Sequence, residues 1–366
     1  MIKGVSLFSN VGIGELNLKK CGIDIVIANE LDKKRCDFYS HIHTDAEMIC
    51  GDINLKYNEI VNKAKLNNCK FFIATPPCQG MSIAGKRDYN DPRNELIIPV
   101  LNAINDIDPD YVLIENVPQI LKHEIEYKGI KDSVENIINK FFSEKYYINK
   151  NKILNAEDYG VPQNRKRAII LMSKYGAWEF PKKQSKVTVR ETIGLLPSVE
   201  AIVEGNENYF KNNAKKIEEC KKVHKWHIPK EHAQRHVLVM KHTPTGKSAF
   251  ENEIYFPKKC DGTKVRGYNT TYKRMEWDKP APTITMANGV LSSQCNVHPG
   301  RLQNDGTYSD ARVLTVYEIM RLFTIKSDWD IPKWASENFI RKVIGEAIPP
   351  LLIEKIVLNL GGKLNG

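Results

Sequence analysis

The stretch SLFSNVGIGELNLKKCGIDIVIANELD, residues 6–32, decides the fold, because it contains a strand, a turn, a helix and a second strand. The first strand runs into Gly12 and Gly14, a helix is predicted over residues 14–21, and the second strand ends at Glu30. Glycines at a strand-to-helix turn let a ligand approach the backbone closely. A carboxylate at the end of the second strand can bind ribose hydroxyls, so the stretch indicates a nucleoside site. A lone Gly-x-Gly pattern is weak evidence by itself.

The same alternation of strand and helix continues through the first 180 residues. The apolar runs lack a period of two, which is typical of strands buried on both faces. Alternating strands and helices predict an α/β fold with a doubly wound, mostly parallel sheet, which binds ligands at the carboxyl ends of its strands. The predicted strands are residues 4–8, 24–28, 71–74, 111–114 and 167–172. The predicted helices are residues 14–21, 33–41, 95–107 and 131–142.

The composition changes after residue 181, where lysine, asparagine and histidine become frequent and the alternation is lost. We therefore expect one domain over residues 1–181 and a smaller, loop-rich domain over residues 182–311. Helical periodicity returns at residues 315–323 and 350–360. We expect residues 312–324 to form a hinge helix and residues 325–366 to complete the first domain.

The charge of the chain favours a polyanionic partner. The 366 residues carry a net charge of +10, and residues 182–247 hold 14 Lys/Arg against 7 Asp/Glu. A basic excess of this kind suits nucleic acid, although a solvated lysine-rich face explains it equally well. No apolar run is long enough to span a membrane and no signal peptide is recognisable, so we expect a cytoplasmic protein. The eight cysteines form no C-x-x-C pair and are expected to be free thiols.

The stretch ATPPCQGMS, residues 74–82, places a cysteine directly after a buried strand and two prolines. Pro76 and Pro77 restrict the backbone where the strand ends. This would hold Cys78 at the carboxyl edge of the sheet, beside the nucleoside site. The thiolate is the reactive form of cysteine, so Cys78 is a candidate nucleophile. A structural thiol is the alternative.

Two further stretches bring charged side chains to the same edge. YVLIENVPQIL, residues 111–121, delivers Glu115 and Asn116 at the end of a strand, where a carboxylate needs a partner or a function. NAEDYGVPQNRKRAIILM, residues 155–172, contains Gln163, Arg165 and Arg167. The two arginines should point to one face and suit a phosphate or a carboxylate. Capping or ordinary surface charge is the alternative for each.

The order and spacing of these four segments resemble the DNA (cytosine-5) methyltransferases of bacterial restriction–modification systems. The resemblance extends to ARVLTVYEIMRLF, residues 311–323, and IGEAIPPLLIEKI, residues 344–356. Only residues 182 to about 275 lie outside the shared motifs. In this family the corresponding region is the variable target-recognition domain, which fits the basic excess.

The resemblance implies that the protein is an enzyme that adds a cysteine thiolate to carbon 6 of cytosine, so that carbon 5 can accept a methyl group. Cys78 would be the nucleophile, and Glu115 would neutralise charge at ring nitrogen 3. Arg165 would hold the cytosine carbonyl or support Glu115, and Arg167 would act structurally behind it. Gln79 and Asn116 complete the expected catalytic set. The base must be flipped out of the duplex, and the loop after Cys78 would close over it.

The resemblance also implies S-adenosyl-L-methionine as cofactor, with S-adenosyl-L-homocysteine as product. Glu30 would bind the ribose and Asp52 the adenine amino group, although Asp52 could simply cap a helix. The expected cofactor-binding residues are Phe8, Ser9, Asn10, Gly12, Gly14, Glu30, Leu31, Asp52, Ile53, Pro77, Leu96, Glu346 and Ile348. The chain departs from the family at Asn10 and Ile13, where glycine is usual, and at Glu346, where asparagine is usual. Asn10 can adopt left-handed backbone angles, whereas Ile13 is harder to accommodate.

The expected partner is double-stranded DNA, read through the major groove by the basic domain. The residues expected to bind DNA are Ser82, Gln163, Arg235, Lys247, Thr283 and Thr285. We expect a monomer with no membrane association and no metal, and a cognate restriction endonuclease as a functional partner is compatible with this interpretation. Clustered histidines near Cys220 match no common zinc spacing and suit positions near phosphate.

Three alternatives remain open. An RNA cytosine methyltransferase would share the catalytic motifs, but about 130 residues of recognition domain favour duplex DNA. An amino-group methyltransferase is disfavoured by Cys78, because that class uses no nucleophile. A DNA-binding regulator that keeps the fold without catalysis would explain the departures at Asn10 and Glu346.

Overall fold

The computed structural model describes residues 1–77, 92–259 and 261–360. Its main sheet has the strand order β3-β2-β1-β4-β5-β10-β8, and β9 pairs with β10 at the side. Strands β1 to β5 run parallel, whereas β10 is antiparallel to β5, β8 and β9. The strands are β1 (Ile2–Leu7), β2 (Ile23–Glu30), β3 (Glu47–Cys50), β4 (Phe71–Ala74), β5 (Tyr111–Asn116), β8 (Tyr147–Ile148), β9 (Ile153–Asn155) and β10 (Lys166–Ser173). The prediction of a doubly wound, mostly parallel sheet is confirmed.

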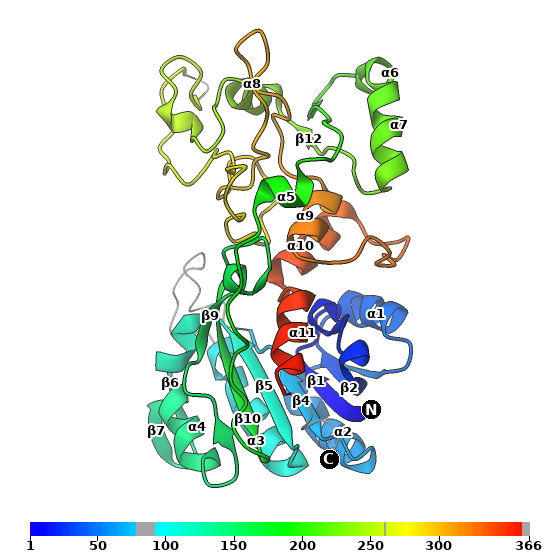
Figure 1. The fold of residues 1–366 in the computed structure, drawn as a ribbon, viewed down its shortest axis with the longest axis vertical. Coiled ribbons are helices and arrows are strands. Elements are labelled where there is room, and N and C mark those ends of the chain that lie inside the picture. The colour runs from blue at the N-terminus through cyan, green and yellow to red at the C-terminus, as the bar shows by residue number, and fades with distance from the viewer. Residues whose placement is uncertain (78–91, 260, 361–366) are drawn as a thin grey trace.

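Helices cover both faces of this sheet (Figure 1). Neighbouring strand residues alternate between the faces, so that Phe72 packs in one core with α2, α3 and α4, while Phe71 packs in another with α11. Both phenylalanines are fully buried, which explains why the strands read as continuous apolar runs. The helices of this part are α1 (Lys33–Ile42), α2 (Ile53–Leu66), α3 (Ile97–Ile107), α4 (Val134–Phe142) and α11 (Pro350–Leu358). Short elements between them are η3 (Pro92–Leu96), η4 (Pro118–Lys122), β6 (Glu124–Tyr127), β7 (Ile130–Ser133) and η5 (Ala156–Tyr159).

The helix predicted over residues 14–21 is wrong. The chain there forms two short 3-10 helices, η1 (Ile13–Glu15) and η2 (Lys19–Cys21). The amides of Glu15, Leu18 and Cys21 each bond to the carbonyl three residues earlier. The side chains of these three residues are buried, and a spacing of three is the repeat of a 3-10 helix rather than an α-helix. The start predicted for the helix over residues 131–142 is also early, because β7 occupies residues 130–133.

The segment after residue 181 has little regular structure. It contains α5 (Val189–Ile193), β11 (Ile202–Val203), α6 (Tyr209–Asn212), α7 (Ala214–Val223), β12 (Glu231–His232), α8 (Gln234–Lys241) and η6 (Ala249–Glu251). A small core of its own includes Ala201, Met240 and Val297. Its two flanks instead pack with α9 (Val316–Leu322) and α10 (Glu337–Glu346), where Val189 and Ile284 share a core with Ile344. The flanks therefore join this segment to the helices that follow it.

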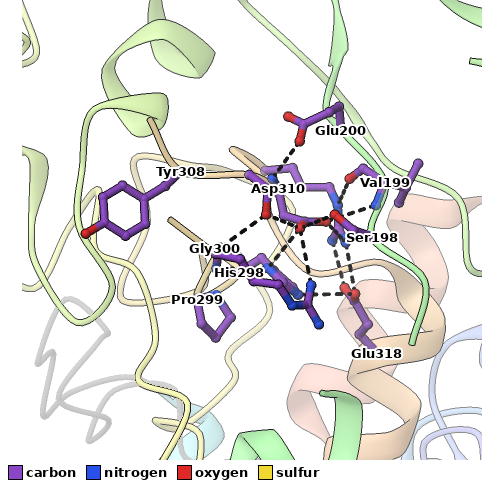
Figure 2. A network of polar contacts seen from close by, with 12 residues as sticks. Ser198, Val199, Glu200, His298, Pro299, Gly300, Tyr308, Asp310 and Glu318 are labelled. Atoms are coloured by element: carbon purple, nitrogen blue, oxygen red, sulfur yellow. Dashed lines mark hydrogen bonds and ion pairs between the residues drawn. The ribbon is translucent and has the colours of Figure 1, made fainter. Parts of the chain in front are cut away.

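Buried charges replace regular structure where this segment meets α9. Arg312 is fully buried and forms ion pairs with Asp310 at 2.9 Å and Glu318 at 2.8 Å. Asp310 also accepts hydrogen bonds from the Ser198 hydroxyl and the Val199 amide, as Figure 2 shows. Paired charges of this kind fix one arrangement of loops, because a wrong arrangement would leave a buried charge unpaired.

Within the described residues, no helix combines the length and the apolar character needed to cross a lipid bilayer. The six cysteines of this part, at positions 21, 36, 50, 69, 220 and 295, are all free thiols, as expected.

Candidate active site

The loops that follow β1, β2, β3, β4 and β5 meet at one edge of the sheet, called here the carboxyl edge. In the loop after β1, Phe8, Asn10 and Gly12 all have positive φ angles, of 57°, 50° and 74°. A Cβ atom on Gly12 would lie 2.2 Å from Nε2 of His43, so only glycine fits there. Asn10 takes the left-handed conformation that was expected to make it tolerable in place of glycine.

Ile13 departs from the family without straining the backbone. Its φ angle is not positive, and it begins η1 directly after Gly12. Its side chain is 1% exposed and packs with Val11 and Phe38. An apolar side chain therefore takes the place of the usual glycine by joining the core beneath the loop.

Glu30 organises the neighbouring turn through main-chain hydrogen bonds. Its Oε2 accepts from the amide of Asn10 at 3.0 Å, and its Oε1 accepts from the amides of Leu31 and Asp32 at 3.0 and 3.1 Å. A carboxylate has about four acceptor positions, so it can still accept a bond from a ribose hydroxyl. Leu31 beside it is 66% exposed, which leaves an apolar surface next to the carboxylate.

A buried carboxylate that the sequence interpretation missed supports the same loop. Glu15 accepts hydrogen bonds from the Ser6 hydroxyl at 2.5 Å and the Tyr39 hydroxyl at 2.6 Å. Burial raises the pKa of Glu15, and the nearby His43 partly offsets the shift. His43 Nε2 in turn lies 3.0 Å from the carbonyl oxygen of Gly12. The sequence could have indicated that Glu15 is buried, because it stands three residues before the apolar Leu18 and therefore on the same face of a helix.

Asp52 and Ile53 lie at the start of α2, after β3. Asp52 is exposed, and its Oδ1 caps the helix by accepting from the amide of Asn54 at 2.7 Å. The capping alternative is therefore present, and it leaves the carboxylate at the surface of the carboxyl edge. Ile53 was expected to contact the cofactor, but its side chain is 4% exposed and packs in the core of the sheet. Leu96, at the end of η3, is half-buried against the same core.

The C-terminal segment lies directly on the loop after β1. A Cβ atom on Gly14 would lie 2.7 Å from Cγ2 of Ile348, and the Asn10 side chain donates to the Val343 carbonyl at 3.3 Å. Glu346 forms an ion pair with Arg35 of α1, with Nη2 and Oε2 2.7 Å apart. Burial raises the pKa of Glu346, although Arg35 opposes the shift. Arg35 was not among the predicted residues.

The backbone that leads to Cys78 is tied to both neighbouring strands. The Thr75 hydroxyl donates to the Phe8 carbonyl at 2.9 Å, and the Asn116 amide group donates to the Pro76 carbonyl at 3.0 Å. Asn116 also accepts from the amide of Val117 at 2.8 Å. Asn116 thus has a positioning contact at the point where the chain leaves β4. The three predicted residues Cys78, Gln79 and Ser82 lie outside the described residues.

The two arginines of the QNRKR stretch have different partners. Arg167 Nε lies 2.8 Å from Oε1 of Glu115, and both side chains are largely buried. Arg165 is 1% exposed and instead donates to the main-chain carbonyls of Ile284 at 3.2 Å and Ala347 at 2.7 Å. Burial lowers the pKa of Arg165, and the charge of Arg167 lowers it further. Of the two roles expected for Arg165, support of Glu115 is provided in this structure by Arg167, whereas contact with the cytosine carbonyl stays a prediction.

Gln163 does not reach the surface as a DNA contact would require. Its side chain is fully buried, and its oxygen accepts from the amide of Ile284 at 3.3 Å. Thr283 is exposed and donates to the Asn164 carbonyl at 2.6 Å, whereas Thr285 is half-buried with its main chain against Gly345. These contacts hold the segment after residue 280 beside the arginine stretch.

The remaining predicted DNA contacts, Arg235 and Lys247, are both exposed. Lys247 forms an ion pair with Glu251 at 3.1 Å. The histidine-rich stretch is structural at His227, which is fully buried between the Thr315 hydroxyl and the Pro197 carbonyl. Within the part of the chain that the structure describes, no group of three His, Cys, Asp or Glu side chains could hold a metal ion.

Comparison with known proteins agrees with this arrangement. A family model described as C-5 cytosine-specific DNA methylase matches residues 2–362. The type II methyltransferase M1.HgaI of Avibacterium volantium is 49% identical over 98% of each chain. The type II methyltransferase M.DdeI of Desulfomicrobium norvegicum is 27% identical over 96% of this chain and 86% of its own.

Solved structures share the fold. A protein encoded within an Escherichia coli prophage and described as a DNA modification methyltransferase superposes with a TM-score of 0.69, at 20% identity over all of both chains. The Dnmt2 methyltransferase of S. pombe superposes with a TM-score of 0.58, at 16% identity over all of both chains.

Proposed function

The chain belongs to the C-5 cytosine-specific DNA methylase family, and we propose that it methylates cytosine within one short sequence of duplex DNA by covalent addition of Cys78. The observation that carries the proposal is the ion pair between Glu115 and Arg167 at the end of β5, beside the Asn116 contact that holds the Pro76 carbonyl. Glu115 and Arg167 thus lie at the end of the strand beside β4, which leads to the cysteine, and Asn116 contacts that segment directly.

The first step concerns the ring. The Cys78 thiolate adds to carbon 6, which forms a carbon–sulfur bond and moves electrons toward ring nitrogen 3. Glu115 would stabilise nitrogen 3 by donating or sharing a proton, and Arg167 would hold that carboxyl in place. Because of its contact with Glu115, Arg167 rather than Arg165 would lie nearest to the base. Carbon 5 then has the electron density to accept a methyl group.

The methyl donor fits the loop after β1. S-adenosyl-L-methionine would supply an electrophilic methyl group on its sulfonium. Glu30 retains capacity to accept from a ribose, and Leu31 offers an exposed apolar surface. Gly12 and Gly14 let the loop pack against His43 and Ile348, which holds it in this shape. Asp52 would accept from the adenine amino group while it caps α2. After transfer, a base, for which a water molecule would serve, would remove the carbon-5 proton. The electron pair of that bond would form the 5,6 double bond as the carbon–sulfur bond breaks, which frees the Cys78 thiolate.

The substrate must leave the duplex for this chemistry, because the carboxyl edge cannot reach a stacked base. We propose that residues 182–311 form the target-recognition domain, that residues 312–324 act as the hinge, and that residues 1–181 with 325–366 form the catalytic domain. The basic charge of residues 182–247 supports this assignment. The similarity to M1.HgaI supports a role in a restriction–modification system, with a cognate endonuclease as functional partner and the enzyme acting as a monomer.

The proposal is tested by incubating the protein and its Cys78→Ser variant with S-adenosyl-L-methionine and a mixed-sequence duplex, followed by bisulfite sequencing. We expect protection of cytosine at one short motif, and loss of that protection by at least about a thousandfold in the variant. Absence of methylation on duplex DNA, with methylation of RNA in a parallel reaction, would contradict the proposal in favour of an RNA substrate.

A further inference from the structure

Glu346 places a carboxylate at the carboxyl edge, at a position where the family has a neutral asparagine. It lies in the last turn of α10, and its side chain is 18% exposed. Burial raises the pKa of Glu346, Arg35 opposes the shift, and the charge of Glu30 raises it further. Glu346 is therefore within electrostatic reach of Glu30, the carboxylate that is proposed to bind the ribose.

Asn10 connects the surroundings of these two carboxylates through the loop after β1. Its amide donates to Oε2 of Glu30 at 3.0 Å, and its side-chain nitrogen donates to the Val343 carbonyl at 3.3 Å. Val343 lies in the same turn of α10 as Glu346, and its carbonyl also accepts from the amide of Ala347 at 3.2 Å. Glu30 and the turn that carries Glu346 thus both contact one residue of the loop that is proposed to bind the methyl donor.

Arg35 forms the ion pair that offsets the charge of Glu346. Nη2 of Arg35 lies 2.7 Å from Oε2 of Glu346, and the arginine side chain is 19% exposed. Within the described residues Glu30 forms no ion pair, and its oxygens instead accept from three main-chain amides. Removal of either charge from the pair would leave the other one uncompensated at a largely buried position, where solvent screens it weakly.

The two small molecules of the proposed reaction differ by a methyl group and one charge at the same sulfur atom. S-adenosyl-L-methionine carries a positive sulfonium there, whereas the sulfur of S-adenosyl-L-homocysteine is neutral. A change of one unit of charge near a partly buried site alters the affinity of a cation by about two- to fivefold and leaves that of its neutral analogue nearly constant. The charge balance at the carboxyl edge can therefore distinguish the methyl donor from the product.

From these observations we infer that Glu346 makes the site favour the methyl donor over the product, because its charge neutralises Arg35, whose guanidinium would otherwise repel the cationic donor. Glu346 is a specificity-determining residue that distinguishes the two ligands by charge rather than by shape. A site that favours the donor keeps working as the product accumulates. The inference rests on the proposed function, in particular on S-adenosyl-L-methionine as the methyl donor.

The ratio of two dissociation constants tests the inference without an activity assay. Isothermal titration of the full chain gives the dissociation constants of both ligands, at pH 8 so that carboxyl groups are ionised and at low salt so that charges are least screened. The variants are Glu346→Gln, Arg35→Gln and the double variant with both changes. Glu218→Gln on α7 is the control, because it breaks an exposed ion pair with Lys221 and Figure 1 draws α7 well apart from α1.

The two single variants should change the ratio in opposite directions. Glu346→Gln leaves Arg35 unpaired, so we expect the donor to lose about threefold more affinity than the product. Arg35→Gln leaves Glu346 unpaired, so we expect the donor to gain about threefold relative to the product. The double variant has the net charge of wild type and should keep its ratio to within about 1.5-fold, even where both affinities fall. Glu218→Gln should change neither the ratio nor the affinities.

A purely structural ion pair would give a different pattern. If the pair only holds the end of α10 in place, both single variants weaken both ligands equally and the ratio stays at the wild-type value, which would overturn the inference. Shifts of the ratio in the same direction in both single variants would overturn it as well. If one single variant unfolds, the other single variant and the double variant decide. If the wild-type protein binds neither ligand, the proposed function has failed and the inference falls with it.

Discussion

The parallel sheet and residues 194–313 use charged side chains in opposite ways. In the sheet, β2, β4 and β5 bury apolar side chains on both faces, and the polar groups stand where the strands end. In residues 194–313, which have little regular structure, Arg274, Asp310 and Arg312 are fully buried in the interior. Arg274 donates to the main-chain carbonyls of Met240 and His298 in place of a strand or helix neighbour. The sheet therefore places its charged groups in the candidate site, whereas residues 194–313 use theirs to hold loops in place.

The largest effect is expected from removal of Arg312, whose buried charge holds loops of residues 194–313 together. Arg312→Met leaves Asp310 and Glu318 buried without their partner, and we expect the protein to lose about 3–5 kcal/mol of stability. Urea unfolding followed by tryptophan fluorescence measures the loss. Lys247→Met, which breaks an exposed pair with Glu251, is the control and should cost no more than about 1 kcal/mol. Equal losses in the two variants would refute the structural role of the buried network.

Arg165 and Arg167 differ in the same way, because we expect a structural role for the first and a catalytic role for the second. Arg167→Lys should lower kcat by roughly a hundredfold, because lysine cannot reproduce the guanidinium contact with Glu115, while the melting temperature stays close to wild type. Arg165→Lys should mainly lower the melting temperature, since it loses the main-chain contacts to Ile284 and Ala347. Methyl-transfer assays and calorimetry on both variants check this. The reverse pattern would restore the roles predicted from the sequence.

The buried network should also make stability depend on pH. Burial lowers the pKa of His298 to about 4, and Nδ1 of this residue accepts a hydrogen bond from the Gly300 amide. Although burial opposes it, Arg312 lowers the pKa of Glu318 to about 2. In both cases the unfolded chain binds more protons than the folded one, so stability falls as the pH drops, first between about 6.5 and 4 and then toward 2.

Calorimetry from pH 7 to pH 4.5 measures this loss, to which His298 should contribute about 2–3 kcal/mol. Burial also lowers the pKa of His232 to about 3, which adds a loss of the same sign, so His298→Asn should reduce the dependence in that range without removing it. A wild-type melting temperature that stays constant from pH 7 to pH 4.5 would show that His298 does not titrate as its burial implies.

The smallest expected effect concerns Glu346, where the family has asparagine. Glu346→Gln should weaken S-adenosyl-L-methionine binding by about three- to tenfold, because the segment over the glycine loop loses its ion pair with Arg35. The charge-reversed pair, Arg35→Glu with Glu346→Arg, should recover most of the affinity in isothermal titration. Affinity that is unchanged in Glu346→Gln would mean that the ion pair does not position the cofactor segment.

The sequence predicted the sheet better than it predicted the interior of residues 194–313. The central strands β1, β2, β4, β5 and β10 were predictable, and β4 matched residue for residue, because a strand buried on both faces reads as an unbroken apolar run. The short strands β8 and β9 at the edge of the sheet were not predicted. The carboxyl edge was predictable because motifs follow those strands directly. The separate roles of Arg165 and Arg167 were not, since spacing alone placed both on one face. Which residue reaches Glu115 depends on where β10 begins.

Contacts between residues that lie far apart in the sequence were the hardest to predict from it. Arg35 and Glu346 are separated by most of the chain, and although Glu346 stood out as a departure from the family, nothing in the sequence pointed to Arg35 as its partner. Glu15 was hidden because its region was interpreted as an α-helix, whereas it is stabilised as a 3-10 helix by a buried carboxylate. In residues 194–313, the buried charges looked like surface charges, because a sequence does not reveal which lysines and arginines are paired.

If the carboxyl edge carries out covalent chemistry on cytosine, Cys78 must form a bond to the base that can be trapped. The most direct measurement incubates the protein with S-adenosyl-L-methionine and a duplex that carries 5-fluorocytosine at the methylated motif, and then separates protein from DNA under denaturing conditions. With fluorine at carbon 5 there is no proton to remove, so the bond between Cys78 and carbon 6 cannot break. We predict a stable protein–DNA adduct with wild type and none with Cys78→Ser. Methylation of the normal duplex without any adduct on the fluorinated one would contradict the account.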